Sequence, residues 1–169
     1  MSVPDPAPDG DAELAELAGE LVALGRRVRD AVRDRLAGGT TAGLSAVVRA
    51  EGGDHIFGVD EVADRLIVDA LAGLGERWSG LWIMEGFAEP LPVGDGAGPW
   101  RFLCDPLDGT RPLLADKRSA WVLVGAGRGA ATLEQLELSV VVEVPTRRAA
   151  LARTAWADRH GRLVADDED

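Results

Sequence analysis

The stretch Asp105-Pro106-Leu107-Asp108-Gly109-Thr110 decides how the rest of the chain is interpreted. It directly follows residues 100–104, an apolar run that predicts a buried strand. Asp-Pro and Asp-Gly are both strong turn signals, so a plain turn after a strand would explain either pair alone. Here two carboxylates lie three residues apart at a strand end, beside a Gly-Thr pair that can expose backbone N–H groups. The stretch therefore indicates a turn that binds a ligand.

The residue types in this stretch suit a metal ion and a phosphate. Carboxylates are the hard oxygen ligands that Mg²⁺ prefers, usually with water and substrate phosphate completing its shell. Gly109 has no Cβ, so a phosphate can approach the backbone closely. Thr110 adds a hydroxyl that can hold or polarise a water.

This hexapeptide resembles the Asp-Pro-Ile/Leu-Asp-Gly-Thr signature of the inositol monophosphatase and fructose-bisphosphatase superfamily of magnesium-dependent phosphatases. Upstream, Ile83-Met84-Glu85-Gly86 is similar to the strand of that family that ends on a metal-binding Glu, with Gly86 in place of the family's second Glu. Asp54 and Asp60 keep the spacing of the family's Asp-x-Val-Thr-x-x-Asp segment, whose Thr is lost here. The resemblance covers roughly residues 11–160 and corresponds to the N-terminal half of such a protein.

The resemblance implies metal-assisted hydrolysis of a phosphate monoester. Four groups would hold Mg²⁺: the side chains of Glu85, Asp105 and Asp108 and the backbone carbonyl of Leu107. Thr110, hydrogen-bonded to Asp60, would orient and help to deprotonate the attacking water, with Glu85 assisting. The backbone N–H groups of Gly109 and Thr110 would bind the phosphate.

Hydrophobic spacing predicts two helices followed by a run of strands. An apolar stripe with spacings of three and four predicts a long helix from Asp11 to Gly38, and a second stripe predicts a helix over residues 59–74. Strands are expected over 81–84, 100–104, 120–126, 136–144 and 149–155, with a loop over 86–99 and either helix or strand over 44–50. This order predicts an α+β fold with two N-terminal helices packed on a mainly antiparallel sheet, as in the N-terminal domain of the sugar phosphatase fold that the resemblance implies. Residues 1–10 are expected to be a disordered lead-in, 11–160 the domain and 161–169 an acidic tail.

Composition narrows the possible functions. The net charge of −11 argues against a nucleic-acid-binding surface, because phosphate backbones require Lys and Arg. The single cysteine, Cys104, excludes an internal disulfide framework. The N-terminus lacks the basic and apolar regions of a signal peptide, and no apolar run reaches the ~20 residues that span a bilayer. We therefore expect a soluble, cytoplasmic protein that binds neither membrane nor nucleic acid.

The resemblance also implies a missing segment. Full-length members carry a second half with a Trp-Asp-x-Ala type segment, which supplies another metal-binding Asp and much of the substrate pocket. Trp156-Ala157-Asp158 has the wrong order and comes too early to replace it. Since dimers are common in the family and the uncovered face is expected to associate, we expect a homodimer or a partner that supplies the missing C-terminal half.

Two functional hypotheses remain open, and a third assigns the acidic loops no function. The chain is a phosphatase or its metal-binding half, or it is a non-catalytic metal- or phosphate-binding module that acts through association with a partner. In the third, the acidic loops of an α+β domain are coincidental: Asp60 is then a helix cap and Glu85 a surface carboxylate. Arg111 and residues 116–119 contact an anionic substrate or form a solvated loop. The sequence leaves the substrate open among inositol phosphates, fructose bisphosphate, nucleotide bisphosphates and other sugar phosphates.

Overall fold

A computed structural model describes residues 9–38, 47–51, 54–130 and 132–168 of the chain. The helical segments are α1 (Asp9–Gly38), α3 (Asp60–Leu74), the short α4 (Thr110–Leu114) and the 3₁₀ turn η1 (Leu133–Gln135). The strands are β1 (Val47–Glu51), β2 (Asp54–Phe57), β3 (Gly80–Met84), β4 (Leu91–Val93), β5 (Trp100–Asp108), β6 (Ala120–Arg128), β7 (Leu138–Val144), β8 (Ala152–Asp158) and β9 (Leu163–Glu168).

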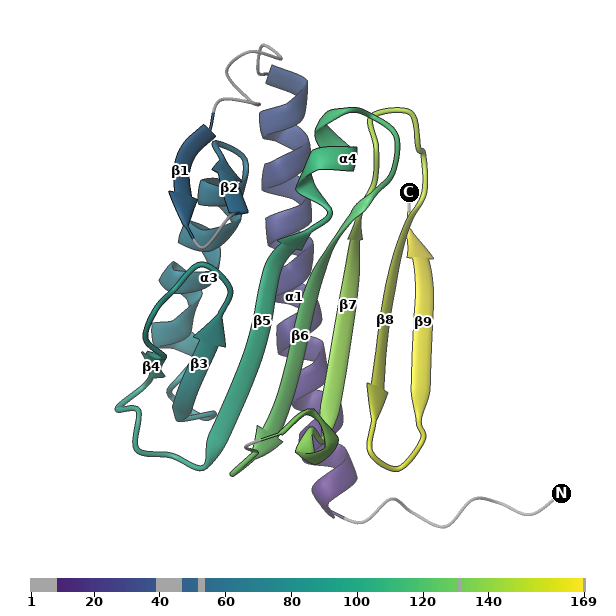
Figure 1. Ribbon diagram of the computed structural model, residues 1–169. Coiled ribbons are helices and arrows are strands. Elements are labelled where there is room, and N and C mark those ends of the chain that lie inside the picture. Colours follow the sequence, from purple (N-terminus) through teal and green to yellow (C-terminus); the bar gives the residue numbers. More distant parts are fainter. Residues whose placement is uncertain (1–8, 39–46, 52–53, 131, 169) are drawn as a thin grey trace, which may run out of the picture.

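A single large sheet organises the molecule (Figure 1). Within the described residues it has seven strands in the order β4-β3-β5-β6-β7-β8-β9, and β1 and β2 form a separate hairpin. Among the neighbouring strands that the structure describes in this sheet, β3 and β5 pair in parallel and the others are antiparallel. The two long helices, α1 and α3, lie together on one face of this sheet. The predicted α+β fold, with helices on a mainly antiparallel sheet, is confirmed.

The apolar side chains of α1 and α3 pack against the sheet and form the core between the helices and the strands. Leu17, Leu21 and Val28 of α1 are fully buried. Each such burial stabilises the fold by about 1.5–3 kcal/mol. Gly25 brings α1 close to β7, because a Cβ there would lie 2.6 Å from Cγ2 of Val142. Beneath α3 the core is aromatic, and Trp82 stacks on Phe102 with ring centroids 5.0 Å apart.

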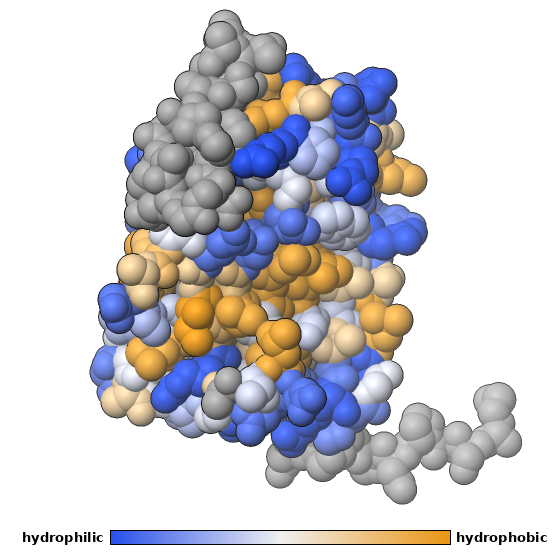
Figure 2. Space-filling model, in the orientation of Figure 1, coloured by the Kyte–Doolittle hydropathy of each residue, from blue (hydrophilic) through white to orange (hydrophobic). Residues whose placement is uncertain are grey.

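The opposite face of the sheet carries apolar side chains that these two helices do not cover. Along β5, Phe102 and Cys104 are buried toward the helices, whereas Leu103 points to the other face and is 39% exposed. Ile83, its partner on β3, is 43% exposed. Figure 2 shows a broad hydrophobic band across the middle of this face. We call this band the apolar sheet face.

The C-terminal boundary differs from the prediction. Residues 161–169 were expected to form an acidic tail, but Leu163–Glu168 is strand β9, paired along β8. Arginines pair with two of its carboxylates: Asp167 pairs with Arg153 at 2.8 Å, and Glu168 pairs with Arg29 of α1 at 2.8 Å. The acidic composition of this segment predicted a solvated tail. The ion pairs were not predicted, because the arginines lie far away in the sequence.

Smaller elements also depart from the sequence pattern. The loop expected over 86–99 contains the edge strand β4, and β5 continues past the predicted end at residue 104 to Asp108. The helix α1 begins at Asp9, two residues before the expected Asp11. Strand β1 settles the choice between helix and strand for residues 47–50.

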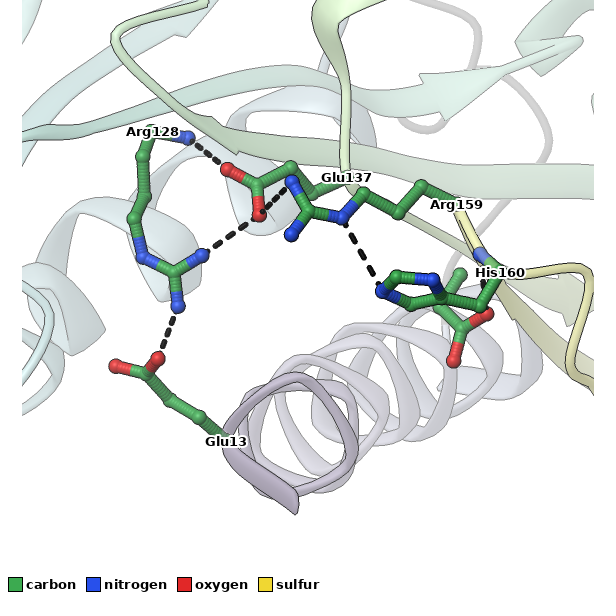
Figure 3. A network of polar contacts seen from close by, with 6 residues as sticks. Glu13, Arg128, Glu137, Arg159 and His160 are labelled. Carbon is green, nitrogen blue, oxygen red and sulfur yellow. Dashed lines mark hydrogen bonds and ion pairs between the residues drawn. The ribbon is translucent and has the colours of Figure 1, made fainter. Parts of the chain in front are cut away.

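A charged cluster joins the ends of four elements (Figure 3). The Glu137 side chain, only 8% exposed, accepts a hydrogen bond from Nη1 of Arg128 at 2.6 Å and pairs with Nη1 of Arg159 at 3.0 Å. Arg128 also pairs with Glu13 of α1 and lies over the Trp100 ring, 4.6 Å from its centroid. The cluster therefore ties α1 to the lower ends of β6, β7 and β8.

Among the described residues, no helix combines the length and the apolar character needed to cross a membrane.

Candidate active site

The parallel pairing of β3 and β5 sets two carboxylates side by side. Met84 is paired with Cys104, so Glu85, which directly follows β3, lies beside Asp105 of β5. The Glu85 N–H donates to the Cys104 carbonyl at 3.0 Å, which extends the pairing by one step. The Asp105 carboxyl is hydrogen-bonded to the Glu85 side chain. Two residues predicted as metal ligands are therefore in direct contact.

This contact changes the acidity of Asp105. Burial raises the pKa of the Asp105 carboxyl, and the hydrogen bond and negative charge of Glu85 raise it further, to about 7. The charge of Asp108 acts in the same direction, while the Leu107 N–H, which donates to Asp105 Oδ1 at 3.0 Å, lowers it. Two like charges in a partly buried site cannot both ionise easily. A bound cation would remove this repulsion.

The signature hexapeptide runs through an irregularity in β5. Asp105 pairs with Leu123 and Asp108 with Trp121, so β5 carries one more residue than β6 between these two pairs. Such a bulge bends a strand and re-aims its side chains. The Leu107 N–H closes a turn onto Asp105, and the Leu107 side chain is 6% exposed. The turn signals of the sequence thus produce a bulge within a strand that continues to Asp108.

Gly109 makes the turn from β5 into α4. Its φ is +91°, in the left-handed region that a side chain disfavours. A Cβ there would lie 3.5 Å from the Ser119 carbonyl and from Cα of Ala120, which is ordinary contact. The backbone conformation, rather than crowding, requires glycine here.

Thr110 joins this turn to the second long helix. Its Oγ1 donates to Asp60 Oδ1 at 2.6 Å and lies 2.9 Å from the Leu107 carbonyl. One hydroxyl hydrogen can serve one acceptor at a time, and the charged, closer Asp60 is the stronger. A lone pair of Thr110 Oγ1 then remains available to accept a hydrogen bond from a water.

Asp60 is not a helix cap. The cap position of α3 is Val59, without a side-chain capping bond, and Asp60 is the first helical residue. One turn further along α3, Asp64 lies within electrostatic reach of the end of β5. Burial raises the pKa of the Cys104 thiol, and the charges of Asp105 and Asp64 raise it further. The first turns of α3 therefore face the carboxylates.

The predicted site residues are brought together only in part. Glu85 contacts Asp105, and Thr110 contacts both Asp60 and Leu107. Asp108 is exposed and reaches Asp105 through its charge alone. In the part of the chain that the structure describes, no three His, Cys, Asp or Glu side chains are grouped closely enough to hold a metal ion. The side chains of Asp54 and His55 lie outside the described residues.

The sequence analysis missed one polar contact near this site. Asp116, just after α4, accepts a hydrogen bond from the Arg147 N–H at 3.0 Å and pairs with Arg148 at 2.9 Å. Its own φ of +54° is left-handed, which is uncommon outside glycine. Asp116 lay within a cluster assigned either to a solvated loop or to substrate contact, and no local pattern links it to residues beyond position 140.

Solved structures with the same arrangement of elements identify the fold. SuhB, the extragenic suppressor protein of Bartonella henselae, matches 89% of the chain with a TM-score of 0.67 and 16% identity. The Leishmania major fructose-1,6-bisphosphatase in holo form matches 96% of the chain, again with a TM-score of 0.67 and 16% identity. An IMPase from Thermotoga maritima matches 89%, with a TM-score of 0.62 and 15% identity.

The chain has the fold of these SuhB, IMPase and fructose-1,6-bisphosphatase structures. The resemblance expected from the sequence, to the N-terminal half of such a protein, is confirmed at the level of the fold. The chain spans about half the length of these relatives: 52%, 52% and 51%. No protein-family model matches the sequence, and no curated protein matches it by sequence.

Proposed function

We propose that this chain is the metal-binding half of a magnesium-dependent phosphatase that hydrolyses a small sugar or inositol phosphate. The Thr110–Asp60 hydrogen bond carries the proposal, because it joins the signature turn to α3 beside the Glu85–Asp105 pair. The bond spans 50 residues of sequence and leaves a lone pair of the Thr110 hydroxyl available to a water. The fold shared with phosphatase structures supports the same assignment.

The donor chemistry suits Mg²⁺, although the described side chains do not preform a complete site. Glu85 and Asp105 supply two adjacent carboxylates, and burial together with the hydrogen bond and charge of Glu85 raises the pKa of Asp105. Asp108 and the Leu107 carbonyl complete the set that would hold the ion. When bound, Mg²⁺ would stabilise negative charge on the reacting phosphoryl group.

The residues of the chain then have distinct roles. Thr110, with its hydrogen donated to Asp60, accepts a hydrogen bond from the attacking water and orients it. Asp60 holds the Thr110 hydroxyl in that orientation, and Glu85 assists in taking the proton of the water. The backbone N–H groups of Gly109 and Thr110 hold the phosphate at the start of α4.

The incomplete metal set leads to the proposed partner. The Glu85–Asp105 pair lies at the edge of the apolar sheet face, since Ile83 and Leu103 precede these residues by two positions on the same strands. A polypeptide that covers this face would also approach the carboxylates and could add the missing ligand. We propose that either a second copy or a partner supplying the C-terminal half does so.

A second candidate function rests on the same incompleteness. Because no three metal-binding side chains come together in the described residues, the chain could instead be a non-catalytic metal- or phosphate-binding module.

A hydrolysis assay distinguishes the phosphatase from the non-catalytic module. It measures the hydrolysis of inositol phosphate and fructose bisphosphate with 5 mM Mg²⁺, by the chain alone and with a C-terminal partner half. Hydrolysis that Asp105→Asn and Thr110→Val abolish supports the phosphatase. Metal binding without any turnover in either setting supports the module.

A further inference from the structure

Positive charge is concentrated in two loops beside the candidate active site. Residues 111–118 and 147–148 contain five Lys or Arg residues and one acid, Asp116, in a chain with 18 basic and 29 acidic residues. We call three exposed members of these loops the cationic cluster: Lys117, Arg118 and Arg147. Such a local excess in an acidic protein creates a patch that attracts anions.

Asp116 holds the two loops together. Its Oδ1 accepts the Arg147 N–H at 3.0 Å, and its Oδ2 lies 2.9 Å from Nε of Arg148. The backbone of Asp116, just after α4, is left-handed, with a φ of +54°. Through the contacts of Asp116, residues that follow β7 are fixed against residues that follow α4, at the upper end of the sheet in Figure 1.

The backbone of the first loop is also anchored. The N–H groups of Lys117 and Arg118 both donate to the Pro112 carbonyl, at 2.9 and 3.4 Å. Within the described part of the chain, the side chains of the cationic cluster enter no ion pair. Hydrogen bonds therefore fix the main chain at these residues, while their side-chain charges remain available to a ligand.

The first of the two cationic loops borders the turn proposed to bind phosphate. The Ser119 carbonyl, next in sequence to Arg118, lies 3.5 Å from the position that a Cβ of Gly109 would occupy. An anionic group held at Gly109 and Thr110 would therefore have the first cationic loop as its neighbour. A substrate with only one phosphate would leave this positive charge unused.

We propose that Lys117, Arg118 and Arg147 form a second anion subsite, so that the substrate is a small molecule with a second anionic group besides the phosphate that is cleaved. This inference rests on the proposed function for the identity of the first group. The subsite itself requires neither metal nor catalysis. It can therefore be tested separately.

The test is equilibrium dialysis of labelled pyrophosphate and labelled inorganic phosphate against the full chain, in low-salt buffer with EDTA. We expect pyrophosphate to bind about tenfold more tightly than phosphate. Pyrophosphate carries more negative charge and can contact all three cationic side chains at once. Alanine at all three positions of the cationic cluster is expected to weaken pyrophosphate binding about tenfold or more.

A matched control removes three arginines elsewhere: Arg27→Ala, Arg35→Ala and Arg65→Ala, all on exposed helix positions. Both triple variants change the net charge from −11 to −14, so a general charge effect would weaken both equally. Asp105→Asn keeps pyrophosphate binding if the subsite is separate from the metal site, even where that variant abolishes hydrolysis. The proposal is overturned if wild-type protein binds no pyrophosphate, or if the two triple variants behave alike.

Discussion

Thr110 and Asp60 lie 50 positions apart in the sequence, yet Thr110 Oγ1 donates a 2.6 Å hydrogen bond to Asp60 Oδ1. Thr110 is 9% exposed, so its hydroxyl is largely shielded from bulk water. The bond links the signature turn after β5 to the first residue of α3. It therefore connects a helix that packs in the core to the turn proposed to carry the chemistry.

Thr110→Val should remove the donor while keeping the shape of the side chain. We expect a loss of about 1–3 kcal/mol in the free energy of unfolding, because the partly buried Asp60 carboxylate loses the hydrogen bond that Thr110 donates. In an assembled phosphatase, we also expect turnover to fall about 100-fold or more with little change in KM. Urea denaturation and steady-state kinetics measure the two effects.

Thr110→Ser retains the hydroxyl and serves as the control. It should keep most of the stability and turnover that Thr110→Val loses. Equal losses in the two variants would show that the methyl group of Thr110, rather than its hydrogen bond to Asp60, is what matters.

The acidity of Asp105 should appear in the pH dependence of stability. Its pKa is about 7 in the folded chain against 3.8 for an ordinary Asp, so between these values the folded state binds more protons than the unfolded state. Stability therefore falls as pH rises through this window, and Asp105→Asn should flatten the fall. The midpoints of urea denaturation at pH 5, 6, 7 and 8, without divalent metal, measure this change of stability with pH.

Asp95→Asn provides a contrast for that experiment. A hydrogen bond from Ser79 and another from the Ala97 N–H lower the pKa of Asp95. Its contribution to stability is therefore present above its unfolded pKa and is lost only at more acid pH. If Asp105→Asn and Asp95→Asn change the slope between pH 5 and 7 to the same extent, the Glu85–Asp105 contact does not control it.

The Glu137 cluster should act as a structural clamp. Glu137→Ala leaves Arg128 and Arg159 without their shared carboxylate, and we expect a loss of about 2–3 kcal/mol in the free energy of unfolding. Glu134→Ala, at an exposed position of the neighbouring turn, should change it by less than about 0.5 kcal/mol. Similar urea midpoints for the two variants would contradict a clamping role.

The apolar sheet face should promote association. We expect the purified chain to sediment faster as its concentration rises, and Ile83→Thr with Leu103→Thr to weaken that dependence. Val68→Thr on α3, where the side chain is also 39% exposed but on the helical layer, should leave it unchanged. A chain that stays monomeric at 100 μM would argue against this face as a docking surface.

Local patterns predicted the fold well where a single periodicity decides the element. The stripe of α1 and the apolar runs of β3, β5 and β6 each follow from neighbouring residues. Strand β9 could not be predicted in this way, because its acids are stabilised by Arg29 and Arg153, which are distant in sequence. The bulge in β5 was hidden because Asp-Pro and Asp-Gly signal turns whether or not the strand continues.

In the candidate site, too, some residues could be predicted from the sequence and others could not. The hexapeptide and its resemblance to a phosphatase signature singled out Asp105, Asp108 and Thr110, and the partnership of Thr110 with Asp60 was expected from that resemblance. The contact of Asp116 with Arg147 depends on a left-handed backbone and on a loop 31 residues away. No spacing within the sequence encodes that contact.

Calorimetric titration of the chain with Mg²⁺ tests the central claim most directly. The account predicts binding that Asp105→Asn and Asp108→Asn each weaken at least tenfold, while Asp166→Asn, an exposed acid on β9, leaves it within twofold. Binding that survives both substitutions, or no heat up to 10 mM Mg²⁺ with and without a covering partner, would contradict a metal site at the end of β5.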